Sequence, residues 1–132
     1  MENQDLKEIK EKIIKFIDKN SRTFLELIEE FPILEGHETH IEFPMKNVEH
    51  SNIIYWEFSK IGAKILIELL NEKKIGFKPM GSDLERTVYL IDGGGLRLPI
   101  AKRPPKSGYQ KLHWLPVWIT TYKNYKEWLE SK

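Results

Sequence analysis

The sequence has no cysteine among its 132 residues. This absence excludes disulfide bonds, zinc sites with thiolate ligands and cysteine nucleophiles, and it is typical of proteins in a reducing compartment. The chain also lacks a run of about 18 apolar residues, which is the length that a membrane-spanning helix requires. Residues 1–12 alternate acids with lysines and contain no apolar stretch of the kind found in signal peptides. We therefore expect a cytoplasmic protein with no membrane partner.

The chain carries almost no net charge, because 21 lysines and arginines oppose 20 aspartates and glutamates, which leaves +1. The charges are unevenly distributed. Residues 1–100 hold 14 basic and 18 acidic residues, a balance of −4, whereas residues 101–132 hold 7 basic and 2 acidic residues, a balance of +5. Such an asymmetry favours an anionic partner, although a basic surface without a binding role explains it equally well.

The size and composition of the chain indicate one folded domain. Hydrophobic residues make up 40% of the sequence and charged residues 31%, which leaves enough apolar material for a core. A chain of 132 residues has the usual size of a single domain. We therefore expect residues 1–132 to form one domain rather than two separate cores.

The first third of the sequence predicts two amphipathic helices. In Leu6–Lys19 and Phe24–Phe31, apolar residues recur every three or four positions, with charged residues between them. Asp5 and Thr23 precede the two segments, and each is followed three positions later by a glutamate, which is the spacing of a capping box. Pro32 should then end the second helix.

A third helix is predicted over Ser59–Lys74, where Ser59 is suited to cap the N-terminus. Its apolar residues form a wide stripe and its lysines lie opposite. Residues 33–52, before this helix, contain glycine, proline and asparagine, and we expect a long connection with one short strand. A β-prone run follows at Ile53–Trp56.

From residue 75 onward the pattern is typical of short strands joined by turns. A hairpin turn is predicted at Asp92–Gly95, where three glycines follow an aspartate. The aromatic stretch around Tyr125 predicts a short C-terminal helix. The predicted strands are Ile75–Lys78, Thr87–Ile91, Leu96–Ile100 and Trp114–Thr120, the last one broken by Pro116.

The order of helix, β-prone step at Arg22–Thr23, helix, long apolar helix and hairpin at Ile75–Ile91 resembles the winged-helix superfamily. The resemblance implies an α+β, winged-helix-like fold. Three N-terminal helices would be followed by an antiparallel β-hairpin or small sheet and a short C-terminal helix. In this interpretation residues 33–58 are an insertion, and residues 101–132 are a basic, aromatic C-terminal extension.

The winged-helix resemblance also implies a way of binding DNA. Such proteins commonly place the third helix in the major groove, which would direct Lys60 and Lys64 toward DNA. Glu68 on the same helix opposes this interpretation, because an acid facing phosphates lowers affinity. The segments Leu98–Ala101 and His113–Pro116 are similar to small uncharacterised bacterial proteins, which implies no activity.

The basic segment at residues 97–111 is the surface that we expect to bind nucleic acid. Its cations attract phosphates, and Tyr109 and Trp114 nearby can stack on exposed bases. The alternatives are a protein partner, or a solvated loop in which Trp114 belongs to the core beside Trp118. The predicted nucleic-acid-binding residues are Lys60, Lys64, Arg97, Lys102, Arg103, Lys106 and Lys111.

The sequence holds no complete catalytic or cofactor motif. His37, His40 and His50 have glutamates nearby, but the spacing is one residue shorter than the His-Glu-x-x-His motif of zinc proteases. Gly93–Gly95 is followed by a strand-like segment, which predicts a hairpin turn and not a phosphate-binding loop. No serine lies in a Gly-x-Ser-x-Gly elbow. We therefore expect a non-catalytic binding module with no catalytic residue, no metal and no cofactor; a metal-dependent enzyme is the remaining alternative.

A protein-interaction or dimerisation module is the second function that the sequence supports. Tyr122, Tyr125 and Trp128 are spaced to form an aromatic row on the C-terminal helix. The apolar run at Ile53–Phe58 suits either the core or a contact between two copies of the chain. A protein partner or a homodimer is therefore the alternative to DNA.

Overall fold

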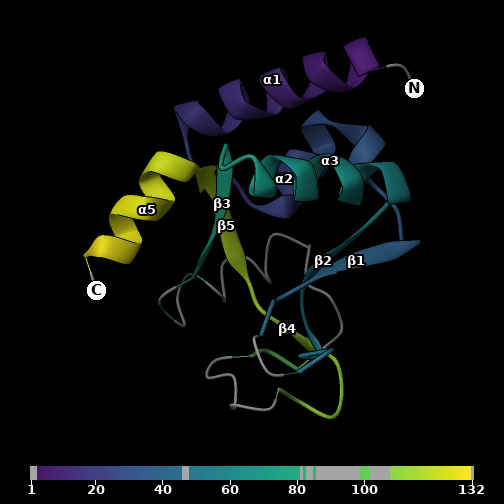
Figure 1. Ribbon diagram of the computed structural model, residues 1–132, viewed down its shortest axis with the longest axis vertical. Coiled ribbons are helices and arrows are strands. Elements are labelled where there is room, and N and C mark those ends of the chain that lie inside the picture. The colour runs from purple at the N-terminus through teal and green to yellow at the C-terminus, as the bar shows by residue number, and fades with distance from the viewer. Residues whose placement is uncertain are drawn as a thin grey trace.

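The computed structural model describes residues 3–45, 48–80, 82, 85, 99–101 and 108–131. These residues form four α-helices, a mixed three-stranded sheet and an antiparallel two-stranded sheet, so the prediction of an α+β fold is confirmed. Figure 1 shows α1 lying across one end of the molecule, with α2 and α3 beside it and the strands extending away from these helices. The elements are α1 (Asn3–Lys19), α2 (Phe24–Glu30), the 3-10 helix η1 (Pro32–Leu34), β1 (Thr39–Glu42), β2 (Ile53–Phe58), α3 (Lys60–Asn71), β3 (Ile75–Pro79), β4 (His113–Trp114), β5 (Val117–Thr121) and α5 (Tyr122–Glu130).

The helix α1 forms where the apolar periodicity predicts it, but its start is different. It begins at Asn3, so the prediction that Asp5 caps it is wrong, and Asp5 lies in the first turn. An acid is favourable in either position, because both are close to the positive end of the helix dipole. Leu6, Ile13 and Ile17 are buried on the face that packs against β5 and α3.

The capping box of α2 is confirmed. The Glu26 N–H donates to Thr23 Oγ1 at 3.2 Å, and the Thr23 N–H donates to Glu26 Oε1 at 3.0 Å. The cap directs Phe24 into the core, where its ring centroid lies 5.3 Å from that of Phe58 and 5.1 Å from that of Phe77. α2 ends at Glu30, which confirms the prediction that Pro32 ends this helix, and η1 begins at Pro32.

The strands β1, β2 and β4 form a mixed three-stranded sheet in which β2 is central. β1 runs antiparallel to β2, with Thr39 opposite Phe58. β4 runs parallel to β2, with His113 opposite Ile53. Every residue of β2 except Glu57 is buried, so this apolar run belongs to the core and is not exposed for a contact between two copies.

The strands β3 and β5 form a second, antiparallel sheet, in which Phe77 pairs with Ile119. On the other edge of β5, the backbone N–H groups of Arg22 and Ile119 each donate to the carbonyl of the other residue, at 2.9 and 2.7 Å. The β-prone step between the first two helices therefore contacts β5. As a result, β5 lies between Arg22 and β3.

The structure corrects two parts of the predicted fold. Three helices do not precede the first sheet, since β1 and β2 lie between α2 and α3. In the part of the chain that the structure describes, β3 pairs with β5 and not with a hairpin partner. The predicted strand Thr87–Ile91 and most of Leu96–Ile100 lie outside the described residues. The predicted strand Trp114–Thr120 is divided at Pro116 into β4 and β5. The winged-helix arrangement is not confirmed in its predicted form.

The buried side chains of the elements from α1 to β5 form one cluster, to which α5 contributes no buried residue. Trp114 is its largest fully buried residue, and its indole N–H donates to the Tyr55 carbonyl at 3.0 Å. This bond satisfies the polar atom that a buried tryptophan brings into the core. No helix in the described ranges is long and apolar enough to cross a membrane.

Candidate functional site

The helix α3 carries two of the predicted nucleic-acid-binding residues. Ser59 caps it as predicted, since its hydroxyl accepts the Gly62 N–H at 3.0 Å and donates to the Ile33 carbonyl at 2.6 Å. Lys60 and Lys64 follow the cap, one turn apart, and both are exposed. Neither lysine forms an ion pair with any residue that the structure describes. Both charges are therefore available to a partner.

The acids of α3 are engaged with α1. Lys10 of α1 lies 3.1 Å from the carboxylate of Glu68 and 3.3 Å from that of Glu72. Partial burial lowers the pKa of Lys10, but the two carboxylates outweigh this effect and hold that pKa above its usual value. The negative charge of Glu68, which opposes phosphate binding in the sequence, is therefore partly neutralised within the protein.

The exposed face of α3 continues beyond the two lysines. Positions seven residues apart lie almost in line, about two turns along the helix. Ile67 is therefore aligned with Lys60, and Asn71 with Lys64. Ile67 is 42% exposed, which is high for an isoleucine, and Asn71 is exposed as well. The face changes from cationic to uncharged over about 16 Å of helix.

A cleft of about 480 Å³ opens beside the C-terminal half of α3. Its other walls come from β1, β2, β3 and α5, and Figure 1 shows α3, β3 and α5 meeting in this part of the molecule. The lining is completed by Glu42, Pro44 and apolar residues of β1, β3 and α3. The residues on which its chemistry depends are His40, Tyr55, Ile67, Asn71, Tyr122 and Tyr125.

Tyr55 contributes a phenol without a partner to the cleft. The residue is only 9% exposed, and its hydroxyl forms no hydrogen bond with the described residues. Burial raises the pKa of Tyr55 above its usual value, and the neighbouring Tyr125 adds to the effect, so the phenol remains protonated. Its ring packs against Phe77 and Phe43, with centroid distances of 4.8 and 6.2 Å. The hydroxyl is thus held in place by the core.

Tyr125 is positioned by the absence of a side chain at Gly76. A Cβ atom at Gly76 would lie 2.4 Å from both Cβ and Cγ of Tyr125, so only glycine permits this approach. The Tyr125 ring lies between those of Tyr122 and Trp128, at centroid distances of 6.3 and 5.8 Å. The predicted aromatic row is therefore present on α5, and two of its members form the cleft.

Both flanks of the basic segment are fixed against the three-stranded sheet. The Ala101 N–H donates to the Trp114 carbonyl at 2.8 Å, and the Tyr109 N–H donates to the Ser51 carbonyl at 2.9 Å. Gly108 has a φ of 78° and lies so close to Ser51 that a Cβ would be 2.6 Å from its carbonyl oxygen. The predicted binding residues Arg97, Lys102, Arg103 and Lys106 lie outside the described residues.

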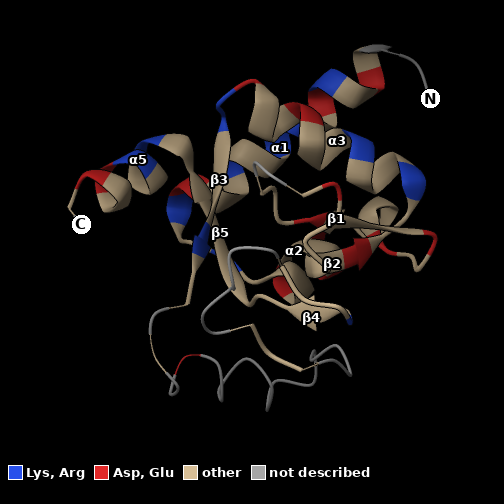
Figure 2. Cartoon of the chain, turned by 60° about the horizontal axis from the view of Figure 1, so that its bottom comes forward, with Lys and Arg blue, Asp and Glu red and all other residues tan. Residues whose placement is uncertain are grey.

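The structure does not bring Lys111 together with the lysines of α3. Lys111 is exposed and lies just before β4, whose His113 pairs with Ile53 at the start of β2. Lys60 follows the other end of β2. That strand has 6 residues and is therefore about 20 Å long. Lys111 therefore lies apart from Lys60 and Lys64. Figure 2 shows acidic residues on and near β1 and β2.

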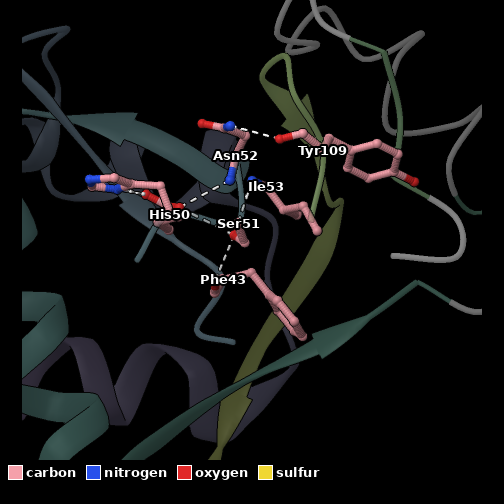
Figure 3. A network of polar contacts seen from close by, with 7 residues as sticks. Phe43, His50, Ser51, Asn52, Ile53 and Tyr109 are labelled. Carbon is pink, nitrogen blue, oxygen red and sulfur yellow. Dashed lines mark hydrogen bonds and ion pairs between the residues drawn. The ribbon is translucent and has the colours of Figure 1, made fainter. Parts of the chain in front are cut away.

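A polar network fixes the turn before β2, next to the basic segment (Figure 3). Glu42 accepts the Asn52 N–H at 3.0 Å, and its other oxygen lies 3.2 Å from His50 Nδ1. Partial burial raises the pKa of Glu42, but these contacts and one with Ser51 outweigh it and hold that pKa below its usual value. The Ser51 hydroxyl donates to a main-chain carbonyl at 2.7 Å, so its proton has a structural role. Asn52 Nδ2 donates to the Tyr109 carbonyl at 2.7 Å and links the network to the basic segment.

The aromatic residues near the basic segment do not form the predicted stacking surface. Trp114 is fully buried, so the prediction that it stacks on bases is wrong and its alternative place in the core is confirmed. Tyr109 is half-buried and stacks on His113 with a centroid distance of 3.6 Å. Trp118 is half-buried and donates its indole N–H to Glu85 at 2.8 Å. These aromatic side chains already pack or form hydrogen bonds within the protein, so they do not present open faces on which bases could stack.

The histidines of residues 37–50 are separated in the structure. His37 Nδ1 lies 2.9 Å from Glu57, His50 contacts Glu42, and His40 lines the cleft. Among the residues that the structure describes, no three histidine, aspartate or glutamate side chains are grouped so that they could hold a metal ion.

Sequence reasoning missed Ile67, Asn71 and Tyr55 as candidate site residues. The first two could have been found, because the seven-residue spacing from Lys60 and Lys64 places them on the same helical face. Tyr55 could not, since its neighbours in sequence are apolar and only the tertiary structure exposes its hydroxyl to a cleft.

Comparison with known proteins adds no candidate function. No family model matches the chain, and no curated protein or solved structure matches it. The geometry of α3 and its cleft is therefore the basis for assigning a function.

Proposed function

We propose that this domain is a cytoplasmic, non-catalytic module that binds nucleic acid through the exposed face of α3. In this function Lys60 and Lys64 neutralise phosphates. A second cationic site adds further phosphate contacts, through Arg97, Lys102, Arg103, Lys106 and Lys111.

The observation that carries this proposal is the pair of unpaired lysines on α3. Lys60 and Lys64 are exposed and lie one turn apart, without an ion-pair partner among the described residues. The acids on the same helix are already bonded to Lys10. Binding to nucleic acid depends on cations that can displace counterions from phosphates, and free lysines do this better than paired ones.

The connectivity around α3 supports a winged-helix scaffold for this function. Along the chain α1 is followed by Arg22, α2, α3, β3 and β5, which is the winged-helix order if the strands of the other sheet, β1, β2 and β4, are insertions. The sheet has Arg22 and β3 on opposite edges of β5. In a domain of this kind, the helix before β3 is the one that faces DNA. β5 is then the antiparallel partner of β3 in the wing, the position predicted for residues 87–91.

The test is a pair of matched charge variants. Lys60→Gln/Lys64→Gln removes the two lysines of α3, and Lys12→Gln/Lys15→Gln removes two exposed lysines of α1. Binding to labelled duplex and single-stranded DNA is followed by fluorescence anisotropy, starting at about 50 mM salt. We expect the α3 variant to bind more weakly, with a salt slope smaller by about two, because each phosphate contact contributes about one. The α1 variant should bind almost as the parent does.

Two results would contradict the proposal. If the parent does not bind either DNA at the lowest salt, the module does not bind nucleic acid. If both variants lose the same affinity, the attraction is a general effect of charge and α3 is not the binding face.

The second cationic site is tested separately by Lys102→Ala/Arg103→Ala/Lys106→Ala. We expect weaker binding to every DNA sequence and a salt slope smaller by about three, because contacts with phosphates carry no sequence information. An unchanged affinity would remove this segment from the proposal and leave α3 as the single contact surface.

A protein-interaction module is the second candidate function, and α5 is the observation in its favour. No residue of α5 is buried, and Leu129 is 46% exposed on the helix that bears the aromatic row. Exposed apolar surface of this kind is typical of contacts between proteins. A dimer in light scattering that Trp128→Ala dissociates would favour this function, and a monomer over a wide concentration range would count against self-association.

A further inference from the structure

The cleft between α3, β1, β3 and α5 combines aromatic side chains with a few polar groups. We propose that it binds an unstacked purine or pyrimidine base, supplied by the nucleic-acid strand whose phosphates Lys60 and Lys64 neutralise. This inference rests on the proposed function and specifies the ligand: a single strand, or an unpaired base within one.

The size and lining of the cleft suit a nucleoside. Its volume of about 480 Å³ lies within the range of roughly 300–1,000 Å³ that is usual for small-molecule sites. Tyr122 and Tyr125 are partly exposed, and Ile67 contributes an apolar surface from α3. Bases have apolar faces that stack on aromatic rings irrespective of sequence.

The hydroxyl of Tyr55 gives the cleft a polar group that no described residue bonds. The residue is only 9% exposed. Its hydroxyl oxygen is not among the described buried polar atoms that lack a partner, so it is open to solvent, and a ligand in the cleft can take the place of that solvent. A protonated phenol both donates and accepts hydrogen bonds, which suits the carbonyl, amino and ring-nitrogen atoms of a base.

Two further polar groups of the cleft suit the edge of a base. Glu42 also lines the cleft, but its carboxylate is already bonded to His50 and the Asn52 N–H. His40 and Asn71 line it from β1 and α3, on different walls. An asparagine amide offers a donor and an acceptor side by side, which is the pattern that recognises adenine. An aliphatic ligand would leave these groups and Tyr55 unbonded.

The position of the cleft on α3 connects it with the phosphate-binding lysines. Asn71 is aligned with Lys64 and lies about 10 Å further along the helix axis. A strand that follows α3 can therefore place one phosphate at Lys64 and a neighbouring base in the cleft. In a duplex the bases are stacked and paired, so the cleft would favour single strands.

The experiment compares oligothymidylate, oligoadenylate and the corresponding duplex with the parent protein and three variants. Tyr55→Phe removes only the unpaired hydroxyl, and Asn71→Ala removes an amide from the edge of the cleft. Asn20→Ala is the control, since it removes an exposed asparagine outside the cleft. Urea unfolding checks that all three variants remain folded.

We expect the parent to prefer single strands over the duplex. Tyr55→Phe and Asn71→Ala should each weaken single-strand binding about threefold to tenfold, the effect of one lost hydrogen bond, and leave duplex binding unchanged. Asn20→Ala should change neither. If the two cleft variants bind single strands as well as the parent does, or lose single-strand and duplex binding alike, the inference is wrong.

A second titration, with free AMP and TMP followed by protein fluorescence, identifies the source of the base. Binding of free nucleotide that weakens in Tyr55→Phe, with oligonucleotide binding insensitive to Lys60→Gln/Lys64→Gln, would support the base site and overturn the proposed function of α3. Oligonucleotide binding that needs the two lysines but not Tyr55 would support the proposed function of α3 and overturn the base site. A cleft that binds neither oligonucleotide nor nucleotide is not a base site.

Discussion

The two sides of α3 hold cavities of similar size and opposite character. On the side of α1, a space of about 570 Å³ is lined by lysines and glutamates, with Lys10 bonded to Glu68 and Glu72 at 3.1 and 3.3 Å. On the other side, the cleft of about 480 Å³ is lined by tyrosines and contains the unbonded hydroxyl of Tyr55.

The difference between these two sides shows why volume alone does not identify a binding site. A ligand entering the space beside α1 has to break ion pairs that already satisfy both partners. A ligand entering the cleft can bond with Tyr55 without breaking a bond that any described residue forms with its hydroxyl. The smaller cavity is therefore the better candidate.

The largest expected change in stability comes from comparing a substitution on the buried face of α3 with one on its exposed face. Leu69→Ala should lower the free energy of unfolding by about 2–5 kcal/mol, because Leu69 is fully buried and leaves a cavity. Ile67→Ala should change it by no more than about 0.5 kcal/mol, since Ile67 is 42% exposed. Urea unfolding measures both. Equal losses would show that Ile67 is a core residue and not part of an open cleft.

A smaller effect is expected where the cleft depends on a missing side chain. Gly76→Ala should destabilise the protein by about 1–3 kcal/mol, because the new methyl group overlaps Tyr125 and displaces α5. Thermal unfolding measures the loss, and near-ultraviolet circular dichroism reports the displaced tyrosines. A variant with parental stability and an unchanged tyrosine signal would contradict the tight contact between Tyr125 and β3.

The ion pairs beside α1 should contribute less. Lys10→Gln is expected to cost at most about 1 kcal/mol at pH 7, because these pairs lie near the surface. The pKa of Lys10 is raised in the folded protein, so its contribution is complete below its ordinary value of 10.5 and is lost as the pH rises through the folded-state pKa. Urea unfolding at neutral and alkaline pH tests this. If the free energies of unfolding of parent and variant differ by the same amount at neutral and at alkaline pH, the effect comes from packing and not from charge.

The smallest effect is expected at Tyr55. Tyr55→Phe should leave the free energy of unfolding within about 0.5 kcal/mol of the parent, because the hydroxyl that it removes has no partner in the described structure. Comparing the two variants contrasts the ammonium group of Lys10, which is paired with Glu68 and Glu72, with the Tyr55 hydroxyl, which no described residue bonds. A loss well above 1 kcal/mol would mean that Tyr55 is bonded in the free protein, and the argument for a ligand would fail.

Local signals in the sequence predicted local structure correctly. Thr23 and Ser59 are the caps that the pattern of side chains indicates, because a cap is decided within one helical turn. The prediction that Asp5 caps α1 was wrong, because an acid near the start of a helix is favourable both at the cap and in the first turn. The sequence does not distinguish these two positions.

Long-range pairing and side-chain accessibility could not be predicted in this way. Alternation of apolar residues identified β3 and most of β5 as strands, but it does not specify which strand pairs with which. The sequence therefore favoured a nearby hairpin over the distant β5. Likewise, the cations of α3 were predicted, but the isolation of Lys111 from Lys60 follows from the direction of β2, which only the fold determines.

The position of β5 has a consequence for the order in which the chain folds during synthesis. α1 and α2 depend on neighbouring residues and can form early, whereas both Arg22 and β3 need β5 as their partner. Neither can complete its pairing until residue 121 has left the ribosome. Pairing between distant segments is slow and leaves apolar strands uncovered meanwhile. In a nascent chain, the backbone edges of Arg22 and β3 that pair with β5 should therefore stay unpaired until β5 emerges.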